Sequence, residues 1–186
     1  MRLFALLGLA VLVSGCATTG PAPAVKVVAA NAAAVASAGS YAWVPDRSGM
    51  AANPLNNADV WRGVVREAVE AELASAGHAK GEGRSAGFVM AFHLVIKDAT
   101  STTVIDNYFG YDAPGVRTHL DAFLKDHADG REGTLVIDAV DPKAKKLLWR
   151  GSATTQLNPN LSVPERKAAI RALVGAVLKD FPERKK

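Results

Sequence analysis

The chain has 186 residues, with 22 lysines and arginines against 18 acidic residues, which gives a formal net charge of +4 at pH 7. An excess this small, with no basic stripe interleaved with aromatic residues, argues against nucleic acid as a partner. The single cysteine, Cys16, excludes an intrachain disulfide and a thiolate metal cluster. A chain of this length can bury one sizeable core, so we expect a single domain.

The first residues have the features of a targeting segment rather than of folded structure. Arg2 supplies a positive start, and Leu3–Val13 follows as an apolar run without a charged residue. At this length the run is too short to cross a bilayer as a stable helix. We therefore exclude it from the fold and interpret it as the core of a signal peptide.

The apolar run closes on the residues Val13-Ser14-Gly15-Cys16, which resemble the lipobox of bacterial lipoproteins. The resemblance implies a signal peptide at 1–15, cleavage before Cys16, and acylation of the Cys16 thiol and of its new amino group. Ala17 follows the cysteine. An aspartate there would indicate retention in the inner membrane, so the outer membrane is favoured. An ordinary secretory signal with an incidental cysteine is the alternative.

Three short segments follow the cysteine. Residues 16–24 contain small, uncharged residues and prolines, which predicts a flexible tether. Val25–Val28 is a candidate first strand, whereas residues 29–39 are compatible with a helix or a loop. Ser40–Val44 has the alternating aromatic character of a strand, which ends before proline.

The next segment predicts a helix followed by the strongest strand in the chain. Residues 54–77 carry apolar side chains at helical spacing, with Asn57 or Asp59 as a cap and Gly77 at the end. After a glycine-rich stretch, Phe88–Lys97 alternates strictly. Its phenylalanines point to one side and His93 to the other.

Residues 98–131 are predicted to be an irregular insert with an amphipathic helix near its end. A loop there carries aromatic residues, which are candidate ligand contacts: Tyr108, Phe109 and Tyr111. His119, Asp121, His127 and Asp129 are close in sequence, but their spacing does not place metal ligands on one helix face. We therefore predict solvated polar residues and no metal site.

Two more strands and a helix complete the chain. Thr134–Val140 and Leu147–Thr154 read as a hairpin, with Asp141 and proline beginning its turn. The last helix is marked by Ser162 and Glu165, which have the spacing of a capping box. The helix ends before Pro182, and the basic last residues are predicted to be frayed.

This order of elements predicts the α+β class. We expect a two-layer sandwich, with a mostly antiparallel sheet of about four to five strands and two main helices on one sheet face. The single domain is predicted to span residues 25–186.

Several segments resemble, in fixed order, a family of bacterial lipoproteins called domain of unknown function 4136. The segments are "SYAWVPD", "VREAVEAELASAGH", "SAGFVMAFHLVIKD", "REGTLVIDAVDPKAKKLLWRGSA" and "AVLKDFPERKK". The resemblance implies an envelope lipoprotein without an established activity, cofactor or catalytic residue. One departure concerns the hairpin turn, where the family has Thr-Gly and this chain has Ala144-Lys145. This change argues against a left-handed turn and for a looser loop.

Asp138 with Asp141, joined by His93, is the best acid/base candidate, because paired carboxylates can separate their pKa values and a histidine can transfer protons. The opposing interpretation is structural. Asp138 shares its face with Val136 and Val140, and Asp141 precedes a turn proline, so a partly exposed sheet face explains these residues without catalysis.

We therefore expect a non-catalytic, lipid-anchored periplasmic module of the outer membrane that binds or scaffolds another envelope component. Its partners would be the membrane, through the lipid on Cys16, and an envelope protein or an amphiphilic ligand, with no cofactor. Two alternatives are a carrier of a lipid or lipopolysaccharide-type amphiphile, and an acid/base hydrolase using Asp138 and His93.

Overall fold

The structure is a computed structural model that describes residues 22–44, 58–97, 102–106, 132–158 and 160–185. Within these residues the chain forms three α-helices, a 3-10 turn at Gly83–Ser85 and seven strands. The strands are β1 (Ala24–Val28), β2 (Ser40–Trp43), β3 (Ala79–Lys80), β4 (Phe88–Lys97), β5 (Thr102–Asp106), β6 (Glu132–Val140) and β7 (Leu147–Gln156). The helices are α1 (Ala32–Ser37), α2 (Ala58–Ser75) and α4 (Val163–Leu178).

All seven strands belong to one sheet, in the order β1-β7-β6-β4-β2-β3. β5 pairs with residues 93–97 of β4, on the edge whose first residues, 88–90, pair with β2. The pairs β1–β7, β7–β6, β6–β4 and β4–β5 are antiparallel, whereas β2 is parallel to both β4 and β3. The α+β class is confirmed. The expected number of four to five strands is corrected, because the sheet has more strands. The sheet is mixed, although most of its strand pairs are antiparallel, as expected.

The additional strands have a physical explanation. β2 and β4 run parallel because α2 lies between them in the chain, and parallel neighbours need such a crossover. β3 has two residues, so it carries no alternation that a sequence pattern could reveal. β5 has five residues within the segment that we predicted to be an irregular insert.

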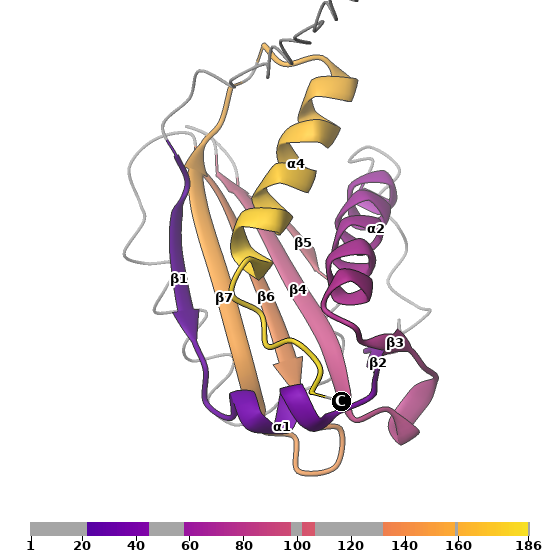
Figure 1. Cartoon of the computed structure of the whole chain (residues 1–186). Coiled ribbons are helices and arrows are strands. Elements are labelled where there is room, and N and C mark those ends of the chain that lie inside the picture. Colours follow the sequence, from indigo (N-terminus) through magenta and orange to yellow (C-terminus); the bar gives the residue numbers. More distant parts are fainter. Residues whose placement is uncertain (1–21, 45–57, 98–101, 107–131, 159, 186) are drawn as a thin grey trace, which may run out of the picture.

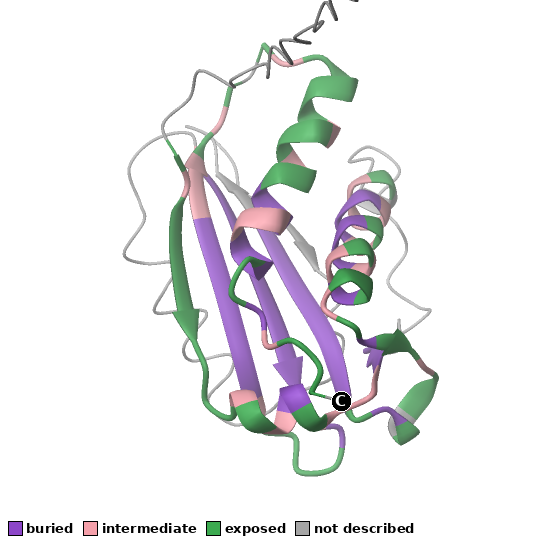
Figure 2. Cartoon of the chain, viewed as in Figure 1, coloured by how far each residue is buried: buried purple, intermediate pink, exposed green. Residues whose placement is uncertain are grey.

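One face of the sheet forms the main core together with the helices. Figure 1 shows α2 and α4 side by side in front of the sheet, and Figure 2 shows that the central strands behind them are buried. We call this surface the helix face. Its buried residues on the three central strands are Phe88, Met90, Phe92, Leu94, Leu135, Ile137, Ala139, Trp149 and Ala153.

The two long helices begin and end at recognisable signals. After α2, Gly77 has φ +85, and its N–H donates to the carbonyl of Ala74 while the next N–H, of His78, donates to Leu73. This pair of bonds is a Schellman motif, so the prediction that Gly77 ends the helix is confirmed. At the start of α4, the Glu165 carboxylate accepts a 2.7 Å hydrogen bond from the backbone N–H of Ser162.

The C-terminal segment is fixed rather than frayed, which corrects the prediction for the last residues. The backbone N–H of Arg184 donates to Ala76, and that of Lys185 donates to Ala36, each at 2.9 Å. Phe181 is buried just before this segment and packs against the ring of Trp149, with centroids 4.9 Å apart. The segment therefore connects the ends of α1 and α2.

The opposite face of the sheet, which we call the far face, is also buried but contains polar side chains. This finding corrects the expectation of a partly exposed surface, since Asp138 is 0% and His93 4% exposed. The buried residues of the far face on β4, β6 and β7 are Val89, Ala91, His93, Thr134, Val136, Asp138, Val140, Arg150 and Ser152.

Candidate functional site

The far face is the part of the described structure with the most buried polar chemistry. Asp138 of β6 lies directly opposite Arg150 of β7 in the strand register. A bulge next to Ala139 creates this pairing, since Val140 pairs with Leu147 whereas Ala139 pairs with Trp149, which leaves Leu148 as the extra residue. Without the bulge, Arg150 would point to the helix face.

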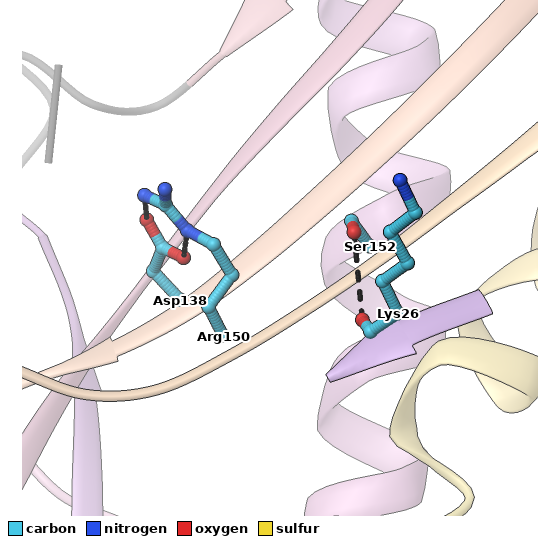
Figure 3. A network of polar contacts seen from close by, with 4 residues as sticks. All are labelled: Lys26, Asp138, Arg150 and Ser152. Atoms are coloured by element: carbon cyan, nitrogen blue, oxygen red, sulfur yellow. Dashed lines mark hydrogen bonds and ion pairs between the residues drawn. The ribbon is translucent and has the colours of Figure 1, made fainter. Parts of the chain in front are cut away.

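Asp138 and Arg150 form a bidentate ion pair (Figure 3). The Arg150 Nε donates to Oδ1 of Asp138 and its Nη2 donates to Oδ2, both at 2.7 Å. The fork of the guanidinium matches the two carboxylate oxygens, and both groups are withdrawn from water. Such a pair is directional, and removing one partner would leave a buried charge without compensation.

Weaker polar contacts continue along the same face toward the edge strand. Ser152, two residues after Arg150, lies opposite Lys26 of β1 and donates a long 3.4 Å hydrogen bond to its backbone carbonyl. The hydroxyls of Thr134 and Thr154 lie 3.2 Å apart across β6 and β7. The far face therefore carries a polar strip that runs across three strands.

His93 lies on the far face, as the alternation of its strand predicts. It is opposite Val136 in the register, so Asp138 is its diagonal neighbour on the adjacent strand. The two candidate acid/base residues therefore share a buried surface. However, both carboxylate oxygens of Asp138 already accept hydrogen bonds from Arg150, and this arrangement supports a structural role. The acid/base hypothesis stays a prediction.

Asp141, the second predicted carboxylate, has a separate role in the hairpin turn. Its Oδ1 accepts hydrogen bonds from the backbone N–H groups of Lys143 at 2.7 Å and Ala144 at 2.8 Å. These two hydrogen bonds hold the pKa of Asp141 below its usual range. Lys145 has φ 54, so the turn is left-handed at the position of the family's glycine, and the expectation of a looser loop is wrong.

A second network, which the sequence did not reveal, lies beside the helix face. The indole N–H of Trp43 and the ammonium of Lys80 both donate to Oε1 of Glu70, at 2.8 and 2.6 Å. The guanidinium of Arg66 stacks 5.0 Å from the centre of the Trp43 ring. Partial burial raises the pKa of Glu70, but the hydrogen bonds from Lys80 and Trp43 outweigh it and lower the pKa overall.

His78 is a third buried polar group that the pattern analysis missed. Its Nδ1 lies 3.0 Å from the carbonyl oxygen of Ala38, and its Nε2 lies 2.9 Å from that of Pro182. The ring also packs edge-on against Phe88 and Phe181. The histidine thus joins the end of α1 to the C-terminal segment, and its role here is structural.

Several residues that the sequence analysis considered lie outside the described residues. These are the lipidation residue Cys16, the aromatic residues Tyr108, Phe109 and Tyr111, and the predicted helix with His119, Asp121, His127 and Asp129. Across the residues that the structure describes, no three His, Cys, Asp or Glu side chains are grouped as a metal site would require. Among the described helices, none is both long and apolar enough to cross a membrane.

The fold and the ion-paired hairpin define an α+β domain built on an open, mixed sheet. The chain belongs to the family described as a domain of unknown function, DUF4136, whose model matches residues 25–183. This assignment confirms the resemblance that the hairpin segment indicated. No curated protein sequence matches the chain.

Two solved structures show a distant likeness. A PelC dodecamer from Paraburkholderia phytofirmans, crystallised in space group C2, has a TM-score of 0.49 at 12% identity, covering 88% of this chain and 100% of that one. A PDZ domain protein from Parabacteroides distasonis has a TM-score of 0.49 at 13% identity, covering 79% of this chain and 32% of that one.

Proposed function

We propose that the protein is a non-catalytic lipoprotein module, anchored by a lipid on Cys16 to the periplasmic side of the outer membrane, which binds or scaffolds another envelope component. The observation that carries the proposal is the lipobox that ends at Cys16. The first strand begins only eight residues later, at Ala24. The folded domain would therefore be held close to the membrane by a short tether.

The geometry of the polar groups supports binding or scaffolding rather than catalysis. Asp138 is engaged by Arg150, Asp141 by the backbone of its turn, and Glu70 by Trp43 and Lys80. Each of these carboxylates therefore stabilises local structure. An acid/base residue would instead need an oxygen available to a substrate.

The packing of the helix face favours a domain with a filled core over a carrier with a cavity for an amphiphile. Phe181 packs against Trp149 and Phe88, with ring centroids 4.9 and 6.0 Å apart. The ring of Tyr41 also stacks on Phe88, with centroids 6.1 Å apart. A carrier would need an apolar cavity between the sheet and the helices, and this is the region that the rings occupy.

A Cys16→Ser substitution in the full chain tests the anchor. We expect the wild-type protein in the outer-membrane fraction with incorporated radiolabelled palmitate, and the variant without the label and depleted from the outer-membrane fraction, because the variant has no thiol to acylate. Ala17→Asp is the matched control for destination: it keeps the lipid but should move the protein to the inner-membrane fraction. A Cys16→Ser protein that still incorporates palmitate, or that stays in the outer-membrane fraction in wild-type amounts, would show that the anchor is wrong.

Crosslinking in cells, followed by purification of the lipidated protein, tests the binding part of the proposal. We expect a defined crosslinked species with wild-type protein, which is absent when the Cys16→Ser variant is used. If purified wild-type protein hydrolysed a panel of ester and glycoside substrates, and Asp138→Asn abolished this activity without unfolding the chain, the acid/base alternative would replace the proposal.

A further inference from the structure

The turn between β6 and β7 carries three lysines, Lys143, Lys145 and Lys146, which we call the basic tip. All three side chains are exposed. The only acidic residue of the turn is Asp141, and its Oδ1 accepts hydrogen bonds from two backbone N–H groups of the turn. That carboxylate keeps its negative charge and interacts with the ammonium groups of Lys143 and Lys146, so the turn presents three exposed lysines with a net charge of +2.

The backbone at Lys145 is held in a conformation that lysine disfavours. Its φ of 54 lies in the left-handed region, and within the described chain it is the one non-glycine residue with a positive φ. Glycine would adopt this conformation without strain. The chain instead places a cation there, and an observed backbone outlier of this kind is a reason to look for a function of the side chain.

The basic tip lies at the end of the sheet opposite the start of the domain (Figure 1). Ala24, where β1 begins, pairs with Thr154 of β7, which lies eight residues beyond Lys146. Eight residues of extended strand span about 26 Å. The basic tip and the residue where the tether joins the domain therefore lie at opposite ends of β7, which leaves the tip clear of the tether; that the tether is anchored at Cys16 rests on the proposed function.

The composition of the basic tip indicates what kind of partner it fits. Protein–protein interfaces concentrate their binding energy in aromatic and arginine side chains. The tip has neither, and the one cyclic residue in the turn, Pro142, is buried. Lysine ammonium groups are strongly hydrated point charges on mobile stems, which suit a hydrated, repeating anion better than a complementary protein surface.

We infer that the basic tip binds an anionic glycan polymer, through carboxylates that repeat along the polymer. Binding is electrostatic, weakens steeply with added salt, and needs no cavity. Lys145 contributes a charge at the apex of the turn, which accounts for a lysine in a glycine-like position.

The test uses the full chain, purified in detergent, and immobilised polygalacturonate, with uncharged dextran as the reference polymer. We expect binding to polygalacturonate alone. One lysine makes one exposed ion pair, so Lys145→Gln weakens binding roughly two- to fivefold. Replacing Lys143, Lys145 and Lys146 together by glutamine weakens it by about 10- to 100-fold. The matched control is Lys167→Gln on α4, which removes the same charge elsewhere and leaves binding unchanged.

A second variant separates charge from backbone strain. Lys145→Gly relieves the left-handed strain, so its thermal midpoint rises while its binding falls as much as that of Lys145→Gln. The inference is overturned if Lys167→Gln weakens binding as much as Lys145→Gln does, or if the wild type is retained equally on dextran and on polygalacturonate. Unchanged binding in the triple variant also overturns it. Because binding is measured in detergent, it does not depend on anchoring, whereas the Cys16→Ser fractionation tests the proposed function alone.

Discussion

The two faces of the sheet are both buried, but they are stabilised in different ways. The helix face is apolar and holds aromatic rings in mutual contact, such as Phe88 with Phe181. The far face contains an ion pair between Asp138 and Arg150. Apolar burial is non-directional, so the helix face depends on volume and shape. The far face has a smaller apolar cluster and adds to it two hydrogen bonds with fixed geometry, so it also depends on register.

This difference means that the two faces should respond differently to substitution. On the helix face, a change is tolerated when the volume is preserved. On the far face, the sign of the effect depends on whether one or both partners of the pair are removed.

Removing one partner of the ion pair should have the largest effect. Arg150→Met leaves the fully buried carboxylate of Asp138 without its guanidinium, and we expect the free energy of unfolding to fall by about 3–5 kcal/mol. Urea denaturation followed by far-ultraviolet circular dichroism measures this loss.

The double variant Asp138→Leu/Arg150→Met is the matched control, because it replaces both charges by apolar side chains. We expect it to recover to within about 1 kcal/mol of the wild type. If the double variant were as unstable as the single one, the ion pair would be acting through packing volume, and the contrast between the faces would be lost.

The same contrast explains which parts of the structure the sequence predicts. The helix face rests on local patterns, and the sequence predicted these elements within a few residues. The patterns are the alternation of Phe88–Lys97, the helical spacing of residues 54–77 and the capping box at the start of α4. The partner of Asp138 was not predicted, although it lies on the neighbouring strand. Counting back from the turn without a bulge pairs Asp138 with Trp149, and only the extra residue at Leu148 brings Arg150 opposite.

The remaining unpredicted features depend on contacts that are distant in sequence. The parallel pairing of β2 with β4 follows from packing of α2 on the sheet, which no short pattern contains. The ring of His78 meets Pro182, more than a hundred residues later in the chain. The sequence alone therefore identified polar residues of the candidate site without identifying their partners.

On the helix face, an added methyl group should be destabilising where the helix is closest to the sheet. Gly151 of β7 lies beneath α4, and a Cβ there would collide with the rings of Trp149 and with Val177. We expect Gly151→Ala to lower the free energy of unfolding by about 1–3 kcal/mol. In combination with Val177→Ala, the loss should be smaller than the sum of the two single losses, which a double-mutant cycle in urea measures. Additive losses would mean that the methyl group and Val177 do not compete for space.

The buried phenol of Tyr41, within the helix face, should make the stability of the protein depend on pH. Burial, with a contribution from the charge of Glu70, raises the pKa of Tyr41 from 10.0 to about 12. Because the folded state favours the neutral phenol, its contribution to stability is complete below pH 10 and is lost as the pH rises from 10 toward 12. Between pH 9 and 11 the free energy of unfolding of the wild type should therefore fall by about 1 kcal/mol through the ionisation of Tyr41. Tyr41→Phe has no phenol and should lack this part of the decrease, which chemical denaturation at each pH measures. If the free energy of unfolding fell equally with pH in both proteins, the prediction would be wrong.

The smallest expected effect has the opposite sign and uses the same chemical change as Gly151→Ala. Gly63 lies within α2, and a Cβ at this position would have no heavy atom within 4 Å beyond its own helix and chain neighbours. Alanine loses less conformational entropy than glycine in a helix, so Gly63→Ala should raise the free energy of unfolding by about 0.5–1 kcal/mol. Urea denaturation of both variants under one condition measures the difference. A loss of stability at Gly63 would mean that its helix packs more tightly than its contacts indicate, whereas opposite signs at Gly63 and Gly151 would show that steric space decides the effect of the methyl group.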